Sequence, residues 1–265
     1  MPWVGVLGLA LLIVALARPQ RGREEFRIRT EGVAIEMCID RSGSMQAMDF
    51  HIDGKRVNRL AAVKKVFEDF VTGTGDLPGR PDDPIGLVAF GGYAHDKCPL
   101  TLDHNALSQI LNTVKIAQPI YDSQGRVINE RLWKEEQLTA IGDAVAHAVD
   151  RLKDANAKSK VIILLSDGEN TAGAIDPAEA AEAAKAYEIK IYTIGVGSTG
   201  LAPFPVGTDR SGRTVLRPGQ VRLDEQTLKM MAETTGGRYF NAKDTEALEE
   251  VYAEIDKLEK TLTEG

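Results

Sequence analysis

The 265-residue sequence has very few of the residues that would mark a disulfide scaffold, a zinc site or a redox centre. It contains two cysteines, Cys38 and Cys98, and neither has a C-x-x-C or Cys/His spacing. Both stand among apolar or strand-forming residues, so we expect buried free thiols. The sequence also has no P-loop, nucleophile elbow or zincin motif, so the signatures of those hydrolase classes are absent.

Positive charge is in short supply as well. Lysine and arginine number 32 against 39 aspartates and glutamates, which gives a formal net charge of -7. Because a nucleic acid backbone is bound through a clustered basic surface, this balance argues against nucleic acid as a partner. The remaining composition, 43% hydrophobic and 27% charged, is that of an ordinary globular protein with one sizeable domain.

One long hydrophobic run stands at the N-terminus. Residues 3–17 carry no charged or polar side chain, and a series of arginines begins at Arg18. We expect residues 1–18 to form a hydrophobic helix that anchors the chain in a membrane and residues 19–31 to be a linker, although a spanning helix usually needs about 20 apolar residues. A signal peptide cleaved at residues 15–17 is the alternative, but no positive segment precedes the run. The arginines favour a cytoplasmic position for the domain that follows.

The rest of the chain alternates buried strands with amphipathic helices. Apolar runs predict strands at residues 32–39, 85–90, 160–165 and 189–196, with a more polar strand at 94–101 and a short edge strand at 238–241. Apolar spacing predicts helices at residues 59–71, 103–114, 138–152, 177–187, 224–235 and 245–262. Residues 118–137 are expected to be a surface loop, and residues 197–221 a loop that contains a hairpin around 209–212.

This alternation predicts the α/β fold class, with a doubly wound, mostly parallel central sheet flanked by helices. We expect one domain over residues 32–262 and a tail at residues 263–265.

Oxygen-bearing side chains cluster where two of the predicted strands end. Asp40, Ser42 and Ser44 follow the strand at 32–39, and Asp167 follows the strand at 160–165. In a doubly wound sheet, ligands bind in the crevice outside the carboxyl ends of the strands. Carboxylate and hydroxyl oxygens suit a hard cation such as Mg²⁺. Each of these residues, taken alone, also fits an ordinary turn.

Together with Thr139, at the start of a predicted helix, these residues resemble the metal-ion-dependent adhesion site of von Willebrand factor A domains, which have a Rossmann-like fold. That family's pattern is Asp-x-Ser-x-Ser on a first loop, a Thr on a second and an Asp before Gly on a third. The resemblance implies that Asp40 anchors the site, partly through waters, and that Ser42 and Ser44 bind the metal directly. Thr139 would bind directly or through water, and Asp167 would hold a coordinated water. Thr139 could otherwise be a helix N-cap.

The flanking sequence is similar to the Bat (aerotolerance) group of bacterial membrane proteins. The similar segments are residues 16–20, 97–101, 139–144, 160–170, 192–197 and 236–240. This resemblance implies a protein of the bacterial cytoplasmic (inner) membrane that acts with sister Bat proteins and a MoxR-type AAA+ ATPase in envelope maintenance or stress tolerance.

Three features depart from the group. No hydrophobic segment follows the closing helix, which indicates a truncated chain or a short variant. The segment 121–137 is longer than the group's usual loop, and we expect it to shape partner choice. Arg41 stands where such sites usually have a small or apolar residue, and we expect a cation beside the metal that weakens metal binding or recruits an acidic ligand.

Different classes of function remain. A non-catalytic binding module would hold Mg²⁺, or Mn²⁺ or Ca²⁺, and a partner's Asp or Glu would complete the coordination. A metal-assisted hydrolase would need a general acid or base, for which Asp49, His51 and Glu169 are the nearby candidates. A surface adhesin is the third hypothesis. Because no set of nucleophile, base and oxyanion donor is recognisable, the sequence favours the binding module over an enzyme.

Overall fold

The computed structural model describes residue 3 and residues 32–74, 77–167 and 169–263. The predicted anchor and linker, apart from residue 3, lie outside the described residues, as do the last two residues of the tail. Within the described part of the chain, no helix combines the length and the apolar character needed to cross a membrane.

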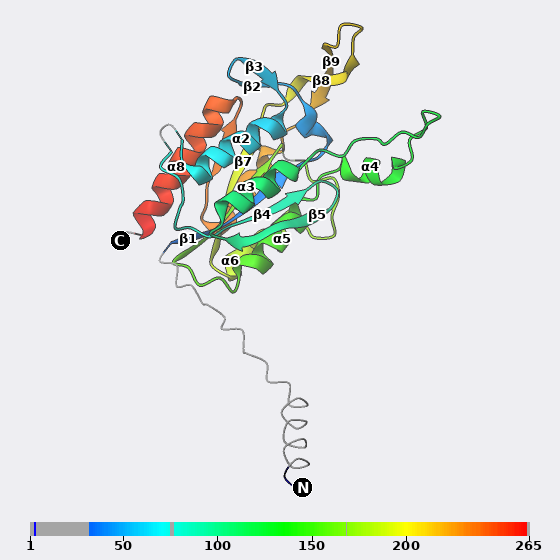
Figure 1. Ribbon diagram of the computed structural model, residues 1–265. Coiled ribbons are helices and arrows are strands. Elements are labelled where there is room, and N and C mark those ends of the chain that lie inside the picture. Colours follow the sequence, from blue (N-terminus) through cyan, green and yellow to red (C-terminus); the bar gives the residue numbers. More distant parts are fainter. Residues whose placement is uncertain (1–2, 4–31, 75–76, 168, 264–265) are drawn as a thin grey trace.

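A six-stranded sheet forms the centre of the molecule (Figure 1). Its strands are β1 (Val33–Asp40), β4 (Ile85–Phe90), β5 (Ala94–Thr101), β6 (Ser159–Ser166), β7 (Ile189–Val196) and β10 (Tyr239–Ala242). They lie in the order β10-β7-β6-β1-β4-β5, and all neighbours are parallel except β4 and β5. The expected doubly wound, mostly parallel sheet is confirmed, and the more polar strand is its antiparallel edge.

The strand order determines where a ligand is expected. The first described strand, β1, lies in the middle of the sheet; the chain then extends to one edge through β4 and β5 and returns to β6 on the other side of β1. The order of the strands therefore reverses between β1 and β6. In doubly wound folds this switch point opens a crevice at the carboxyl ends of the two strands.

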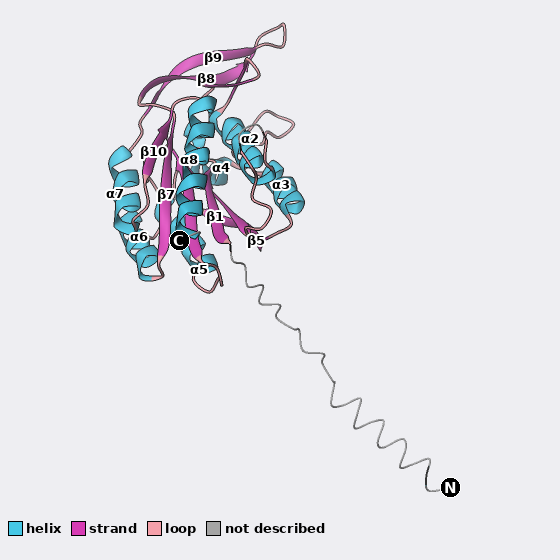
Figure 2. Cartoon of the chain, turned by 90° about the vertical axis from the view of Figure 1, so that its left-hand side faces the viewer, coloured by secondary structure: helices cyan, strands magenta, loops and turns pink. Residues whose placement is uncertain are grey.

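Helices cover both faces of the sheet (Figure 2). One face carries α2 (Arg59–Thr72), α3 (His104–Thr113) and α8 (Thr245–Thr263), and the other carries α5 (Ile141–Leu152), α6 (Pro177–Ala186) and α7 (Glu225–Thr235). Successive residues of β1 enter opposite cores, so that Met37 packs in the first and Cys38 in the second. Burial on both faces explains the continuous apolar runs of the parallel strands. Cys38 and Cys98 are buried free thiols, as expected.

Most predicted elements agree closely with the structure, but three segments differ. The predicted loop 118–137 contains the short helix α4 (Glu130–Glu136), whose exposed surface carries ion pairs from Arg131 to Glu135 and from Lys134 to Glu130. An unexpected hairpin, β2 (Phe50–Ile52) and β3 (Lys55–Val57), turns at two residues with positive φ, Asp53 and Gly54. Residues 197–221 are mostly a long hairpin of β8 (Gly200–Thr208) and β9 (Thr214–Val221), joined at the predicted turn.

Candidate metal centre

Asp40 is the last residue of β1 and lies completely buried at the carboxyl end of the strand. One of its carboxylate oxygens accepts a 2.8 Å hydrogen bond from the backbone N–H of Ser42, and the other accepts a 2.6 Å bond from the Ser166 hydroxyl. Burial, followed by the nearby charge of Asp167, raises the pKa of Asp40 to about 7 in spite of these bonds. The carboxylate therefore faces an environment that favours neutralisation.

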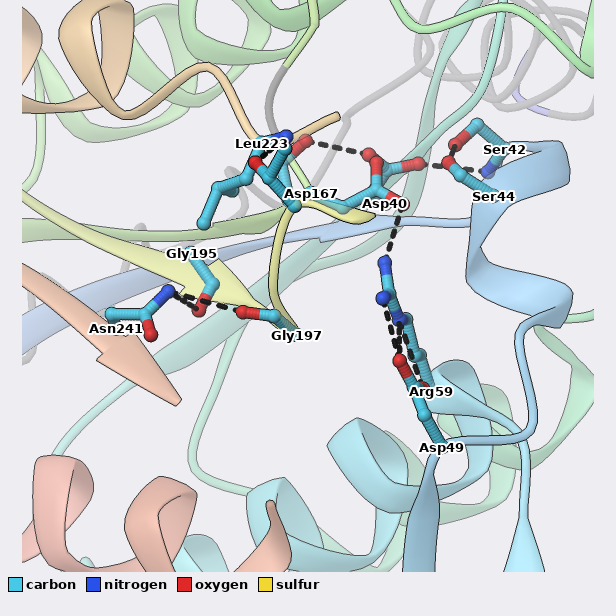
Figure 3. A network of polar contacts seen from close by, with 12 residues as sticks. Asp40, Ser42, Ser44, Asp49, Arg59, Asp167, Gly195, Gly197, Leu223 and Asn241 are labelled. Atoms are coloured by element: carbon cyan, nitrogen blue, oxygen red, sulfur yellow. Dashed lines mark hydrogen bonds and ion pairs between the residues drawn. The ribbon is translucent and has the colours of Figure 1, made fainter. Parts of the chain in front are cut away.

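Ser42 and Ser44 enter the site from a single turn of 3₁₀ helix, η1 (Gly43–Gln46). Ser42 is the N-cap of this turn, but its side chain caps no backbone N–H. The two serine oxygens instead lie 3.0 Å apart and share one hydrogen bond (Figure 3). Both hydroxyls thus point to the same place, beside the Asp40 carboxylate.

Asp167 follows β6 and forms an ion pair with the buried Arg59. Nη1 of Arg59 donates to Oδ2 of Asp167 at 3.1 Å (Figure 3). Nε and Nη2 of Arg59 donate to the Asp49 carboxylate at 2.6 to 3.1 Å. Arg59 is 1% exposed although it is the first residue of α2. Burial raises the pKa of Asp167, against hydrogen bonding from Ser44 and the charge of Arg59.

Gly197 leaves space for the Arg59 guanidinium because it has no side chain. A Cβ atom at this position would lie 2.4 Å from the guanidinium, and the backbone of Gly197 has a φ of +89°. Only glycine satisfies both conditions without strain. The residue that follows β7 therefore packs directly against the arginine that holds Asp167.

Thr139 is positioned by the loop that follows β6. Its N–H donates to the Thr171 hydroxyl at 3.0 Å, and its carbonyl accepts from the N–H groups of Thr171 and Ala172. Thr139 is not the N-cap of α5, because that position belongs to Ala140, and the Asn170 side chain accepts from the N–H of Ile141. The threonine hydroxyl has no hydrogen-bond partner among the described residues.

A hollow of about 430 Å³ opens at this point. Its lining includes Ser44, Thr139 and Asp167, while Asp40 and Ser42 are fully buried behind them. The five residues proposed from the sequence are therefore gathered at one place. The rest of the lining comes from Gln137, Leu138, Glu169, Thr171 and residues 220–222 at the end of β9, so the β8–β9 hairpin borders the hollow.

The donor set fits a small divalent cation. Two carboxylates and three hydroxyls supply oxygen only, and Mg²⁺ is typically held by one or two carboxylates together with waters. The raised pKa values of Asp40 and Asp167 indicate that Arg59, which also pairs with Asp49, does not fully offset the burial of these two carboxylates. Among the described residues, no group of three or more His, Cys, Asp or Glu side chains is arranged to hold a metal. A metal here would depend on the serine and threonine hydroxyls.

Arg41 does not have the position expected for it. Its Nη2 forms a 2.5 Å ion pair with Glu136, and its Nη1 donates to the Lys115 carbonyl at 3.3 Å. Glu136 is itself 6% exposed and also contacts His95. The charge of Arg41 is thus compensated inside the protein, so the expectation that it recruits an external acidic ligand is wrong.

The candidates for acid–base catalysis are dispersed. Asp49 is bound to Arg59, and His51 is exposed on the β2–β3 hairpin. Of the three, only Glu169 lines the hollow, where it is exposed.

Two positioning residues were not found from the sequence. Arg59 was assigned only to a helix, and nothing local to it shows that its partners lie in other loops. Asn170 stands three residues after Asp167 and had no predicted role of its own. The position of Arg59 at the start of a predicted helix could have indicated an acidic partner. The N-terminal end of a helix disfavours positive charge unless an acid compensates it.

A model of the von Willebrand factor type A domain family matches residues 35–254. An uncharacterised protein from Borreliella burgdorferi is 26% identical over 239 residues, which cover 90% of this chain and 62% of that protein. The chain thus spans less than two thirds of the length of this relative.

Solved structures with a similar fold include BatB from Bacteroides thetaiotaomicron, with a TM-score of 0.62, 26% identity and coverage of 86% of this chain and 100% of that one. An aerotolerance-related membrane protein from Bacteroides fragilis has a TM-score of 0.61 and 24% identity, with coverage of 84% and 98%. Proximal thread matrix protein 1 from the mussel byssus, solved with zinc in its MIDAS motif, has a TM-score of 0.57 and 18% identity, with coverage of 87% and 46%. The last two likenesses concern the fold alone.

Proposed function

Because the chain belongs to the von Willebrand factor type A domain family, we propose that it is a non-catalytic protein-binding module that engages its partner through a divalent cation. Asp40, Ser42, Ser44, Thr139 and Asp167 would hold the ion. An aspartate or glutamate of the partner would complete the coordination. Mg²⁺ is the first choice for an all-oxygen donor set, with Mn²⁺ or Ca²⁺ as alternatives.

The observation that carries this proposal is the one-sided hollow. Asp40 and Ser42 are buried, whereas Ser44, Thr139 and Asp167 border open space of about 430 Å³. A cation held in this way would keep at least one coordination position toward solvent. Serine and threonine hydroxyls leave more positive charge on the ion than carboxylates do, so the open position would attract a carboxylate from outside.

A non-catalytic role is supported by the surroundings of the hollow. Asp49 is committed to Arg59, and His51 lies on an exposed hairpin that does not border the hollow. Hydrolysis would depend on Glu169 alone. Metal-dependent turnover in a phosphatase and esterase screen, lost in Asp40→Asn, would contradict this part of the proposal and favour the hydrolase hypothesis.

We place the module at the bacterial inner membrane, anchored by residues 1–18, in a complex with sister Bat proteins and a MoxR-type ATPase. The fold is shared with BatB and with an aerotolerance-related membrane protein. The hydrophobic character of residues 3–17 supports the anchor. An adhesin displayed on the cell surface is less favoured, because the anchor would directly precede the domain.

The test is co-purification of the full-length chain with a sister Bat protein from the same bacterial membranes, in Mg²⁺ and in chelator. We expect capture in Mg²⁺ only, and loss of capture in Asp40→Asn. Asp150→Asn, which removes an exposed carboxylate on α5, serves as the matched control. Equal capture with and without chelator would refute the metal bridge.

A further inference from the structure

The β8–β9 hairpin is basic in a chain that is acidic. Between Gly200 and Arg222 there are four arginines, at positions 210, 213, 217 and 222, against the single aspartate Asp209, while the whole chain has a net charge of -7. All four arginines are exposed. The hairpin projects from one end of the molecule (Figures 1 and 2).

The arginines of the hairpin have no acidic partner within the described part of the protein. Asp209, which directly precedes Arg210, accepts hydrogen bonds from the Ser211 hydroxyl and from the backbone N–H groups of Ser211 and Arg213, and so stabilises the turn. No ion pair joins any of the four guanidinium groups to a carboxylate of the described residues. These charges are therefore open to an external anion.

A groove of about 1030 Å³ is lined in part by the hairpin. Its apolar lining comes from several separate elements and includes Leu60 from α2, Tyr121 and Trp133 from the segment that holds α4, and Val206 from β8. Tyr121 is 61% exposed and Val206 is 51% exposed. Leu60 is 4% exposed and Trp133 is half-buried, so the exposed apolar surface of the groove comes mainly from Tyr121 and Val206. Exposed apolar side chains beside a groove indicate a surface for a partner.

The charged lining of the groove is also mostly positive. Three lysines, Lys64, Lys65 and Lys115, stand against one acid, Glu68. Lys65 is paired with Asp69, but Nζ of Lys64 donates only to the carbonyls of Asn112 and Val114, each at 3.1 Å. Two lysines at the groove thus have no carboxylate partner among the described residues.

The groove adjoins the candidate metal centre. Gln46 lines the groove and Gln137 lines the metal-binding hollow, and their side chains are hydrogen-bonded at 3.0 Å. The hairpin borders both spaces, through Pro205–Thr208 at the groove and through Gln220–Arg222 at the hollow. One extended ligand could therefore occupy the groove and reach the metal.

We propose that the hairpin and the groove seat an acidic segment of a partner protein, with apolar side chains of that segment in the groove and carboxylates on the arginines and lysines. The segment would also supply the carboxylate for the metal, so this inference rests on the proposed function. The apolar lining favours a protein over a nucleic acid, whose phosphates would match the arginines but not Leu60 and Val206.

The test uses a random dodecapeptide library displayed on phage and selected on the full-length chain in Mg²⁺. We expect enrichment of peptides that combine several Asp or Glu residues with an aromatic or aliphatic residue. A fluorescent peptide of the enriched sequence would then be titrated against the wild type, against the double variant R213S/R217S and against V206S. We expect each variant to bind about 3- to 10-fold more weakly, with the effect of the double variant decreasing at high salt.

The control is K97S/K185S, which removes two exposed lysines that form no ion pair within the described residues and lie outside both spaces. If chelator or Asp40→Asn abolishes peptide binding but R213S/R217S and V206S leave it unchanged, the inference is overturned and the metal-bridged function stands. If the variants weaken binding but chelator does not, the basic surface is supported and the metal bridge is overturned. Absence of enriched acidic peptides, or tighter binding of a single-stranded oligonucleotide than of the peptide, also overturns the inference.

Discussion

Arg59 holds one acidic side chain of the candidate metal centre in place. Its guanidinium contacts both Asp167 and Asp49 from a fully buried position, and Gly197 leaves the space for it. Removing one partner of a buried ion pair is costly because the remaining charge stays in a poor environment. The pair Arg59 and Asp167 therefore fixes the third loop of the site.

We predict that Arg59→Met lowers the free energy of unfolding by about 3 kcal/mol, since it leaves Asp167 buried without its cation. Urea denaturation of the variant at neutral pH measures this change. Arg56→Met, which removes an exposed arginine from β3, is the matched control. A loss no larger than that of the control would show that Arg59 is not needed to hold Asp167.

Glu36 is a second residue whose environment has a measurable consequence. It lies in the middle of β1 with its side chain against Gly86 of β4, and both carboxylate oxygens are buried without a hydrogen-bond partner. Burial, and secondarily the charge of Asp96, raises the pKa of Glu36 well above its usual range, with Arg151 opposing. The folded protein therefore binds a proton here that the unfolded chain releases.

This difference determines the sign of a pH effect. Because the pKa of Glu36 is raised on folding above its ordinary value of 4.5, its contribution decreases stability as pH increases from that value up to the raised folded value. We predict that Glu36→Gln removes this dependence, so that the variant gains stability relative to the wild type as pH rises through that window. Thermal unfolding over a pH series measures it, with Glu182→Gln on the exposed side of α6 as control. Parallel curves for wild type and Glu36→Gln would contradict the assignment.

At the scale of elements, the start of α5 and the loop after β6 form one unit. The Asp143 carboxylate accepts from the N–H groups of Ala174 and Ile175, and Asn170 caps the helix. Gly142 allows this approach, because a Cβ atom there would lie 1.9 Å from the carbonyl oxygen of Ile175. The second and third loops of the site are thus held together by close backbone packing.

We predict that Gly142→Ala destabilises the protein by about 1–3 kcal/mol, since rigid backbone must move to admit the methyl group. The displacement would also disturb Thr139, so the variant should bind Mg²⁺ more weakly than the wild type in calorimetric titration. Ala146→Ser, on a half-exposed position of the same helix, is the control. Unchanged stability and metal affinity would exclude this coupling.

The elements also show which structures local sequence can predict. The strands β1, β4 and β6 and the helix α2 follow directly from apolar periodicity. Apolar periodicity does not predict helix α4, because this helix has no apolar stripe. Ion pairs between its own side chains accompany it instead. The hairpin β2–β3 had a usable signal in Asp53-Gly54, a typical two-residue turn, but its polar and short strands gave no periodicity.

At the scale of the whole molecule, a bound metal would link three separate loops and stabilise the folded state. Binding to the folded form alone adds about 2.7 kcal/mol when the free ligand is at about 100 times its Kd. For a domain of this size we predict an increase in Tm of roughly 5–10 °C on saturation with Mg²⁺.

Thermal unfolding of the full-length chain in MgCl₂, in chelator and in NaCl of equal ionic strength measures this increase. Asp40→Asn should lose the Mg²⁺-dependent part of the increase, whatever its own stability, while Asp150→Asn should keep it. A Tm that does not respond to Mg²⁺, Mn²⁺ or Ca²⁺ at millimolar concentrations would contradict the metal-binding role of the five residues.

The sequence by itself determined the alternation of strands and helices, the doubly wound sheet and the positions of Asp40, Ser42, Ser44, Thr139 and Asp167 at its loops. These features depend on local periodicity and on short motifs, and both can be recognised in the amino-acid sequence.

Only the tertiary structure decided how the charges around the site are paired. It placed Arg59 beneath Asp167, 108 residues away, and turned Arg41 toward Glu136, 95 residues away. It also set the basic hairpin beside the groove. A long side chain can reach several partners, and its choice depends on which distant loops the packed sheet brings within a few ångströms.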